Sequence, residues 1–298
     1  MSVAVASNPL GAAFYADRAL HSRAAVVENV CLARDIYRLR LEWPELASRI
    51  VPGQFVMLRL PGCNDPLLGR PLALYDTWSD AAGVLTGIDV VYLVVGKMTR
   101  LLAELRPGDA IEVWGPLGNG FSTAPVDHLV MVAGGIGQTP FLALGREALG
   151  GRTYGDPPRS SPQVKRATLC YGVRNVELLA GVPDFEAAGL EVRIASDDGS
   201  VGSHGLVTKL LEELLDEIAG SGRSVRIACC GPERMMEAVA AIANGRGLPC
   251  EVSLETPMAC GIGICFSCVT KVRQPNGEWD YKRTCVEGPI FDAQKIVW

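Results

Sequence analysis

The pattern of apolar residues changes near residue 125, and this change restricts the possible folds more than any other feature. Upstream of it, residues 24–121 form short runs that are β-branched or alternate apolar with polar side chains, with Pro and Gly between them. Several strands at such spacing are typical of a small antiparallel barrel. One helix is expected inside this region, over the segment KMTRLLAEL.

Downstream of the change, unbroken apolar strands alternate with helices. The expected strands are HLVMVA, RATLCYGV, LEVRIASDD and VRIACCGP, and the expected helices are FLALGREAL, LVTKLLEELLDEIA and ERMMEAVAAIAN. Buried strands that alternate with helices form a parallel, doubly wound sheet. The sequence therefore predicts a multidomain β plus α/β chain with four parts: an N-terminal extension (1–23), an antiparallel β-barrel (24–122), an α/β domain (123–250) and a small C-terminal domain (251–298).

Composition excludes several classes of function. The 298 residues are 48% apolar, and the 28 Lys and Arg are scattered along a chain of net charge −5. Neither a nucleic-acid-binding surface nor a membrane span of about 20 apolar residues is expected. The N-terminus has no compact apolar stretch behind a basic start, so we expect no secretory signal and a cytoplasmic location.

Four of the ten cysteines are clustered in the last part of the chain. The spacing C-x4-C-x2-C-x16-C is formed by Cys260, Cys265, Cys268 and Cys285. A close triplet with one distant ligand is the plant-type pattern for a [2Fe–2S] cluster, and Gly261 and Gly263 permit the tight turns of a loop around it. The alternatives are a structural zinc ion and no metal; zinc ribbons usually supply two C-x2-C pairs, and this segment has one.

Five further cysteines lie alone or beside apolar residues. In a large chain without a secretory signal, reduced thiols are more common than disulfides. Because free cysteine usually packs as a small hydrophobe, we expect buried structural thiols at Cys31, Cys63, Cys170, Cys229 and Cys250.

Three segments could bind phosphate. AGGIGQTP joins an apolar strand to a helix, and Gly135 and Gly137 would let a phosphate approach the N–H groups of the helix start. Pro140 stands where the G-x-G-x-x-G pattern has its third glycine, and a plain strand–helix turn would also explain the glycines. In the barrel region, Arg70 could pair with a diphosphate, and Thr99 lies at a helix start. A surface ion pair and a simple N-cap are the respective alternatives.

Together these segments resemble the ferredoxin reductase superfamily. R-P-x-x in the barrel and G-x-x-T before a helix are similar to its flavin domain, and AGGIGQTP, CYGVRN, SDDGSVGSHGLVT and CCGPERMMEAV are similar, in order, to its nicotinamide domain. One branch adds a C-terminal [2Fe–2S] segment. PGQFVMLR, GPLGNGF, ETPMACGIGICFSC and YKRTCVEGPIFDAQKI resemble that branch, the electron-transfer subunit of the NAD-linked, two-subunit dihydroorotate dehydrogenase. The likeness extends from about residue 24 to residue 298.

The resemblance implies three cofactors and their residues. FAD would be bound by Arg70, Pro71, Leu72, Ala73, Val91, Tyr92, Leu93, Met98 and Thr99. NAD would be bound by Gly135, Gly137, Thr139, Pro140, Cys230, Gly231 and Pro232, and the [2Fe–2S] cluster by the four clustered cysteines. The family usually has serine at position 73 and glycine at position 98, so the potential of the flavin should differ and the Met98 side chain must point away from the phosphates. Asp197 and Asp198 are candidates for the ribose of the nicotinamide cofactor.

The resemblance also implies an activity and a partner. NAD exchanges hydride, a cluster exchanges single electrons, and FAD does both, so the chain would convert between them without a catalytic acid or base. The partner would be an FMN-containing dihydroorotate dehydrogenase catalytic subunit of pyrimidine biosynthesis, in a heterotetramer. Ile264 and Phe266 would either contact that partner at the rim of the cluster or fill the core of the small domain.

Two other functions remain open at this point. The first is a flavin and iron–sulfur subunit with another partner, as in a ferredoxin–nicotinamide transhydrogenase, a sulfide dehydrogenase or a hydrogenase. The second is a zinc-stabilised interaction protein without redox activity, built on a decayed reductase fold. Ala73 and Met98, which depart from the family pattern, would suit the second alternative.

Overall fold

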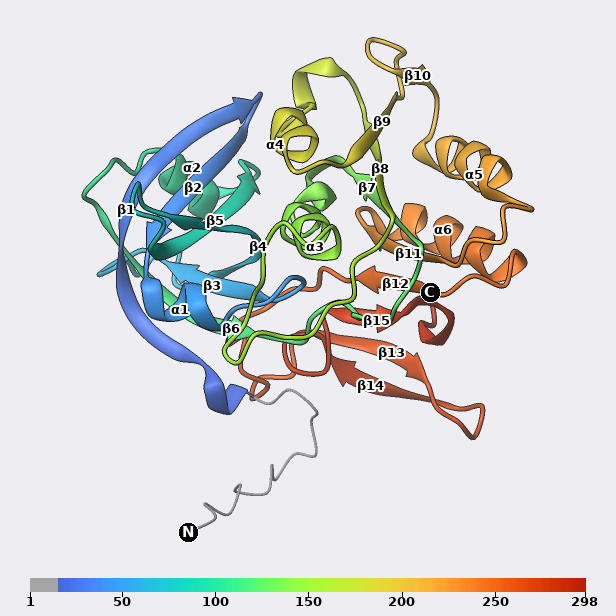
Figure 1. The fold of residues 1–298 in the computed structure, drawn as a ribbon. Coiled ribbons are helices and arrows are strands. Elements are labelled where there is room, and N and C mark those ends of the chain that lie inside the picture. The colour runs from blue at the N-terminus through green and yellow to red at the C-terminus, as the bar shows by residue number, and fades with distance from the viewer. Residues whose placement is uncertain (1–15) are drawn as a thin grey trace.

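The computed structural model describes residues 16–298 and shows a β-barrel beside an α/β domain (Figure 1). A short 3₁₀ helix, Ala16–Arg18, precedes the barrel. The first barrel strand then begins at Leu20, within the segment expected as an N-terminal extension. The rest of that extension, residues 1–15, lies outside the described residues. Within the described part, no helix is both long enough and apolar enough to cross a membrane.

The expected antiparallel barrel is confirmed. It closes in the strand order β1-β2-β5-β4-β3-β6 around an aliphatic core. The strands are β1 (Leu20–Ala33), β2 (Ile36–Glu42), β3 (Phe55–Arg59), β4 (Arg70–Ser79), β5 (Leu85–Leu93) and β6 (Ala110–Leu117). The expected helix is α2 (Lys97–Ala103), and a second short helix, α1 (Pro44–Arg49), begins with a proline in its first turn. Alternating side chains point into the barrel, as in β6, where every second residue is buried.

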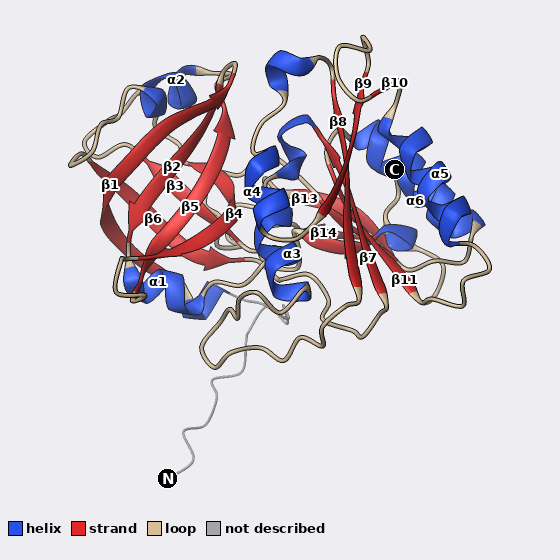
Figure 2. Cartoon of the chain, turned by 45° about the horizontal axis from the view of Figure 1, so that its top comes forward, coloured by secondary structure: helices blue, strands red, loops and turns tan. Residues whose placement is uncertain are grey.

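The α/β domain is also confirmed, with a sheet in the order β10-β9-β8-β7-β11-β12-β15. Its strands are β7 (His128–Gly134), β8 (Arg166–Val173), β9 (Glu191–Ser196), β10 (Ser203–His204), β11 (Val225–Cys230), β12 (Cys250–Ser253) and β15 (Ile290–Asp292). Helices cover both faces (Figure 2). The face toward the barrel carries α3 (Phe141–Ala148) and α4 (Val182–Ala187), and the other carries α5 (Val207–Ile218) and α6 (Glu233–Gly245).

The cysteine-bearing segment is joined to the α/β sheet. Strand β12 crosses the boundary expected at residue 250, and β15, near the C-terminus, pairs with it as an antiparallel edge strand. Between them the chain forms a separate hairpin of β13 (Val269–Arg273) and β14 (Trp279–Arg283). This hairpin was not predicted from the sequence, although its turn contains an Asn-Gly pair, which is a strong hairpin signal.

The expectation for the isolated cysteines was partly wrong. Cys170, Cys229 and Cys250 are buried in strands of the α/β sheet, as predicted. Cys31, however, is exposed, because it lies near the end of the long strand β1, where the burial of side chains fades. Cys63 is partly exposed in the turn region between β3 and β4. Apolar neighbours alone therefore did not indicate burial.

Candidate cofactor sites

The hairpin brings the distant fourth cysteine back to the other three. Cys260, Cys265 and Cys268 lie in the loop between β12 and β13, and Cys285 follows β14. Because β13 and β14 are paired, the N–H of Thr284 donates to the carbonyl of Cys268 at 2.8 Å. The Sγ atoms of Cys268 and Cys285 are 3.2 Å apart. The long gap in the cysteine spacing is thus the length of one hairpin.

The four thiols are arranged as two pairs. Hydrogen bonds from Ser267 and Cys260 lower the pKa of Cys265 to about 6. The contact with Cys285 lowers the pKa of Cys268 to about 6 and raises that of Cys285. Within residues 16–298, no three His, Cys, Asp or Glu side chains gather around one point as ligands of a single ion. Two pairs of thiols fit a two-iron cluster, in which each iron takes two cysteine ligands.

The loop that carries the thiols needs its glycines. Gly261 and Gly263 have φ angles of +73° and +82°, which other residues rarely adopt. A Cβ at Gly261 would lie 2.6 Å from Met57 Cγ in the barrel, and one at Gly263 would lie 2.6 Å from a methyl group of Val286. The loop therefore turns tightly, as expected from its glycines, and it also packs directly on β3, which was not predicted.

The expected flavin residues are divided between two environments. Arg70, Pro71, Leu72 and Ala73 begin β4 and are only half-buried. On β5, Val91 belongs to the apolar cluster of the α/β domain, and Leu93 packs against it. Tyr92 instead points into the barrel, where its hydroxyl is 3.2 Å from Asn29 Oδ1. Only the backbone of Tyr92 is therefore available to a flavin.

A side chain from the first turn of α2 binds the backbone just before the helix. Thr99 Oγ1 accepts hydrogen bonds from the N–H groups of Val95 and Gly96 at 3.0 and 3.1 Å. Gly96 is the N-cap and Thr99 is the third residue of the helix, so the simple N-cap that the sequence offered as an alternative for Thr99 is not observed. Met98 is buried in the barrel core, so its side chain points away from the helix start. Lys97 forms an ion pair with Asp65, which links this loop to the one before β4.

Large apolar side chains are exposed on these two loops. They belong to Leu67, Leu68 and Val95, which flank Arg70 and Gly96. Exposed apolar surface of this kind often marks a ligand-binding groove. The two loops thus offer both polar groups and apolar surface to a cofactor that has rings and a diphosphate.

The expected nicotinamide residues come together at the carboxyl edge of the sheet. The glycine loop follows β7. Cys230 ends the neighbouring parallel strand β11, and Gly231 and Pro232 come directly after it. A Cβ at Gly137 would lie 2.3 Å from the carbonyl oxygen of Cys230, whereas one at Gly135 would meet nothing within 4 Å. Strand order reverses between β7 and β11, and ligands of such sheets bind at this switch point.

The other expected residues lie around the same edge. Thr139 is buried, and Pro140 is the N-cap of α3. Burial raises the pKa of Cys230 to about 12, so its thiol stays neutral. Asp197 and Asp198 follow β9, two strands away from β7. Their role at the ribose stays a prediction.

Sequence profiles of known families match all three parts of the chain. The iron–sulfur cluster binding domain of dihydroorotate dehydrogenase B matches residues 255–297, an oxidoreductase FAD-binding domain matches 23–121, and an oxidoreductase NAD-binding domain matches 131–241. A protein of Desulforamulus reducens named dihydroorotate dehydrogenase B (NAD(+)), electron transfer subunit, is 34% identical over 276 residues, 92% of this chain and 97% of the relative. The chain belongs to the family of dihydroorotate dehydrogenase B electron transfer subunits.

Another relative carries the same name, and solved structures of other reductases share the fold. A relative of the same name from Geobacillus kaustophilus is 36% identical over 281 residues, 92% of this chain and 98% of the relative. The solved structure of an NADH-dependent reduced ferredoxin–NADP oxidoreductase, described for flavin-based electron bifurcation, has a TM-score of 0.74 at 28% identity and covers 92% of this chain and 90% of that one. The cytochrome b5 reductase domain of Ulva prolifera nitrate reductase shares the fold at 18% identity, with a TM-score of 0.58 and coverage of 77% and 94%.

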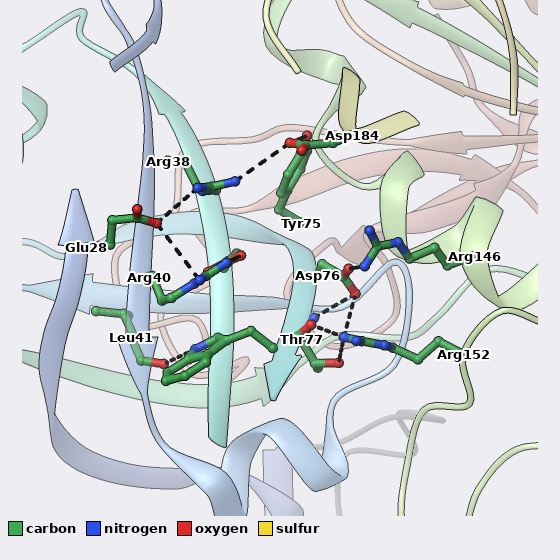
Figure 3. A network of polar contacts seen from close by, with 12 residues as sticks. Glu28, Arg38, Arg40, Leu41, Tyr75, Asp76, Thr77, Arg146, Arg152 and Asp184 are labelled. Atoms are coloured by element: carbon green, nitrogen blue, oxygen red, sulfur yellow. Dashed lines mark hydrogen bonds and ion pairs between the residues drawn. The ribbon is translucent and has the colours of Figure 1, made fainter. Parts of the chain in front are cut away.

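In this family member, an ion-pair network that the sequence analysis missed joins the barrel to the α/β domain (Figure 3). Asp76 of β4 is buried and accepts a hydrogen bond from the hydroxyl of Tyr154 at 2.6 Å. The same carboxylate pairs with Arg146 of α3 and lies 3.5 Å from Arg152. These contacts tie the strand that begins with the expected flavin residues to the helix that follows the glycine loop.

The network continues on the other side of a cavity of about 260 Å³. The hydroxyl of Tyr75 donates to Asp184 of α4 at 2.7 Å, and Arg38 lies 3.9 Å from that carboxylate (Figure 3). Within the barrel, Arg40 holds Asp89 through two hydrogen bonds of 2.8 Å. One signal was readable in the sequence, since Arg38 and Arg40 are two apart on a strand and so lie on one face.

Proposed function

We propose that this chain is the electron-transfer subunit of an NAD-linked dihydroorotate dehydrogenase. It passes electrons from an FMN-containing catalytic partner, through a [2Fe–2S] cluster and FAD, to NAD⁺ in pyrimidine biosynthesis. The observation that carries this proposal is the pairwise arrangement of four thiols on a loop packed against the barrel. The relatives named as dihydroorotate dehydrogenase B (NAD(+)) electron transfer subunits support the same assignment.

The residues of the chain fit the three cofactors. In the proposal, FAD lies against Arg70, Pro71, Leu72 and Ala73 at the start of β4, and its diphosphate lies at the loop before α2. NAD lies at the switch point between β7 and β11, and its phosphates approach the open side of Gly135. When bound, the cofactors supply hydride and single-electron chemistry. The chain contributes binding, separation from water and fixed relative positions.

The catalytic partner docks at the rim of the cluster loop. Ile264 and Phe266 are 64% and 57% exposed, so the alternative that they fill the core of the small domain is wrong. Trp279 and Tyr281 extend the exposed apolar surface along β14, beside a hollow of about 500 Å³. Exposed apolar patches of this kind mark protein interfaces. We place a partner here, in a heterotetramer.

A cytoplasmic location suits the thiols. All ten cysteines are free, including the paired Cys268 and Cys285. Free thiols persist where glutathione and thioredoxin keep them reduced. Nicotinamide turnover and pyrimidine synthesis would proceed in the same compartment.

The test is reconstitution with the partner under anaerobic conditions. The chain is coexpressed with an FMN-containing dihydroorotate dehydrogenase subunit, and reduction of NAD⁺ by dihydroorotate is followed at the absorbance of NADH. We expect turnover only when both chains are present. A complex that holds FMN, FAD and iron yet fails to reduce NAD⁺ with dihydroorotate would refute the proposed donor.

One observation favours a second candidate. The similarity to the NADH-dependent reduced ferredoxin–NADP oxidoreductase extends over almost the whole chain. A transhydrogenase-type subunit would accept electrons from reduced ferredoxin rather than from dihydroorotate. Supplying reduced ferredoxin in the same assay separates the two, because only the transhydrogenase-type subunit would reduce nicotinamide with it.

A further inference from the structure

Trp114, on barrel strand β6, contacts the cluster loop with one end of its indole and the start of β4 with the other. Its Nε1–H donates to the backbone carbonyl of Cys260 at 2.9 Å. The far edge of the ring lies against Gly69, because a Cβ at Gly69 would be 2.8 Å from Trp114 Cη2. Gly69 directly precedes Arg70, the first residue of β4. One rigid side chain therefore connects a cluster ligand to the strand that carries the proposed flavin residues.

The neighbouring strand β3 supports the same contact. Met57 is paired with Trp114 across β3 and β6 and with Pro71 across β3 and β4. Met57 is fully buried, and the close approach of Gly261 to its Cγ seats the cluster loop directly on it. A side chain at position 261 would collide with Met57, so the backbone of the loop lies directly against the barrel.

The hydrogen bond acts on the backbone of the ligand residue and not on its sulfur. An indole N–H is a donor only, and it needs an acceptor when the ring is packed in protein. Because Trp114 uses the carbonyl of Cys260, the Sγ of Cys260 stays available to iron. The bond therefore fixes the orientation of the loop without competing for the ligand.

We propose that Trp114 is a positioning residue that holds the Cys260 loop in one place and orientation against β4. It thereby keeps the cluster and the flavin at a constant separation. This inference rests on the proposed function, since it presupposes both cofactors. Fixed separation matters because a displacement of about 1 Å can change a reaction rate on the order of 100-fold.

The test compares Trp114→Phe with the unmodified chain, both purified anaerobically with FAD and cluster. Phenylalanine keeps an aromatic ring but loses the N–H donor. Loss of one hydrogen bond predicts amide exchange about fivefold faster in the peptide that spans residues 258–268. We also expect the electron paramagnetic resonance spectrum of the reduced cluster to broaden, because the loop then samples several orientations. Loss of iron with FAD retained would be a stronger form of the same result.

Trp78→Phe is the matched control. The Trp78 indole donates to the carbonyl of Leu41 at 3.0 Å, so the control loses the same kind of bond in the same barrel, away from the cluster loop. It should leave both readouts of the cluster loop unchanged. If Trp114→Phe matches the unmodified chain in exchange and in spectrum, or if Trp78→Phe changes both equally, the inference is overturned.

A second measurement needs no variant and covers the case in which Trp114→Phe does not fold. In the ¹⁵N–¹H spectrum of the unmodified chain, the paramagnetic cluster should broaden the indole signal of Trp114 but not that of Trp78. A Trp114 signal as sharp as that of Trp78 in the iron-loaded chain would contradict the inference. A chain that binds no iron under any condition would instead refute the proposed function, so the two failures are distinguishable.

Discussion

Single residues in the cluster segment have roles that follow from where the backbone turns. Gly261 and Gly263 adopt positive φ angles and approach neighbouring side chains closely, so the backbone turns tightly between Cys260 and Cys265. Phe266 also has a positive φ, +56°, and the guanidinium of Arg283 lies 5.1 Å from its ring centre. A strained and exposed aromatic residue beside the cluster ligands is consistent with a role in contacting another protein.

Replacing one thiol should remove the cluster without unfolding the chain. In Cys285→Ala, we expect iron and the visible absorption of the cluster to be lost while FAD is retained, because alanine has no donor atom and the barrel has its own core. Iron and flavin analysis of the purified variant checks this. Cys31→Ala, at an exposed thiol outside the cluster, should keep both. Full iron content in Cys285→Ala would exclude Cys285 as a ligand.

His128 should make stability depend on pH. It is fully buried in β7, its Nε2 is 2.8 Å from Thr168 Oγ1, and burial lowers its pKa to about 4. Between about pH 6.5 and 4 the unfolded chain binds a proton that the folded chain does not, so stability is lost as the pH falls through this range, by up to about 3 kcal/mol. Denaturation midpoints at pH 7.5 and 4.5 should differ less in His128→Gln. An equal loss in both chains would contradict this.

At the scale of secondary structure, the pattern of apolar residues predicted those helices and strands whose burial can be read from their own sequence. The antiparallel barrel, the alternation of β7, β8, β9 and β11 with helices, and α2 were predicted, because alternating residues and apolar runs reflect burial within one chain segment. Strand β15 was missed because it has only three residues and its pairing with β12 is non-local. The orientation of Tyr92 into the barrel was also not predicted. Its neighbours Val91 and Leu93 are apolar as well, so the sequence does not show which residues of this strand face inward.

The contact between β4 and α3 could not be predicted for a different reason. Asp76 is far in sequence from both Arg146 and Arg152, and charged residues are usually exposed. Their pairing exists only because the barrel and the α/β domain are packed together. Nothing in the sequence distinguishes these three charged residues, yet together they form a contact between the two domains.

Breaking this contact should destabilise the chain markedly. Asp76→Asn leaves Arg146 and Arg152 without their carboxylate, and disruption of a buried ion pair costs about 3 kcal/mol. Glu45→Gln is the control: it removes an exposed pair with Arg49 at 2.7 Å and should cost less than about 0.5 kcal/mol. Urea denaturation of the FAD-loaded chains measures both. Equal stability of the two variants would show that the network is not structural.

At the scale of the whole molecule, the cluster segment is placed between the two larger domains. Its loop packs on β3 and β6 of the barrel through Met57 and Trp114, and its last strand, β15, extends the α/β sheet. The exposed side of the loop is left for a partner. This placement gives the proposed order of cofactors a structural basis: cluster, barrel with FAD, then the switch point with NAD.

The docking surface makes a specific prediction. Ile264→Ser should weaken binding of the FMN-containing subunit about tenfold, because an exposed apolar side chain that becomes buried in an interface contributes on the order of 1–2 kcal/mol. Leu206→Ser, at a comparably exposed leucine before α5, should bind normally. Affinity is measured by calorimetry on iron- and FAD-loaded chains. Equal affinity of both variants would move the interface elsewhere.

The most direct test of the account is metal and sulfide analysis of the anaerobically purified chain, combined with electron paramagnetic resonance after reduction by NADH. We predict about two irons and two acid-labile sulfides for each FAD, and a signal of a reduced [2Fe–2S] cluster. A chain that contains zinc in place of iron, or an iron centre that NADH cannot reduce in the presence of FAD, would contradict it.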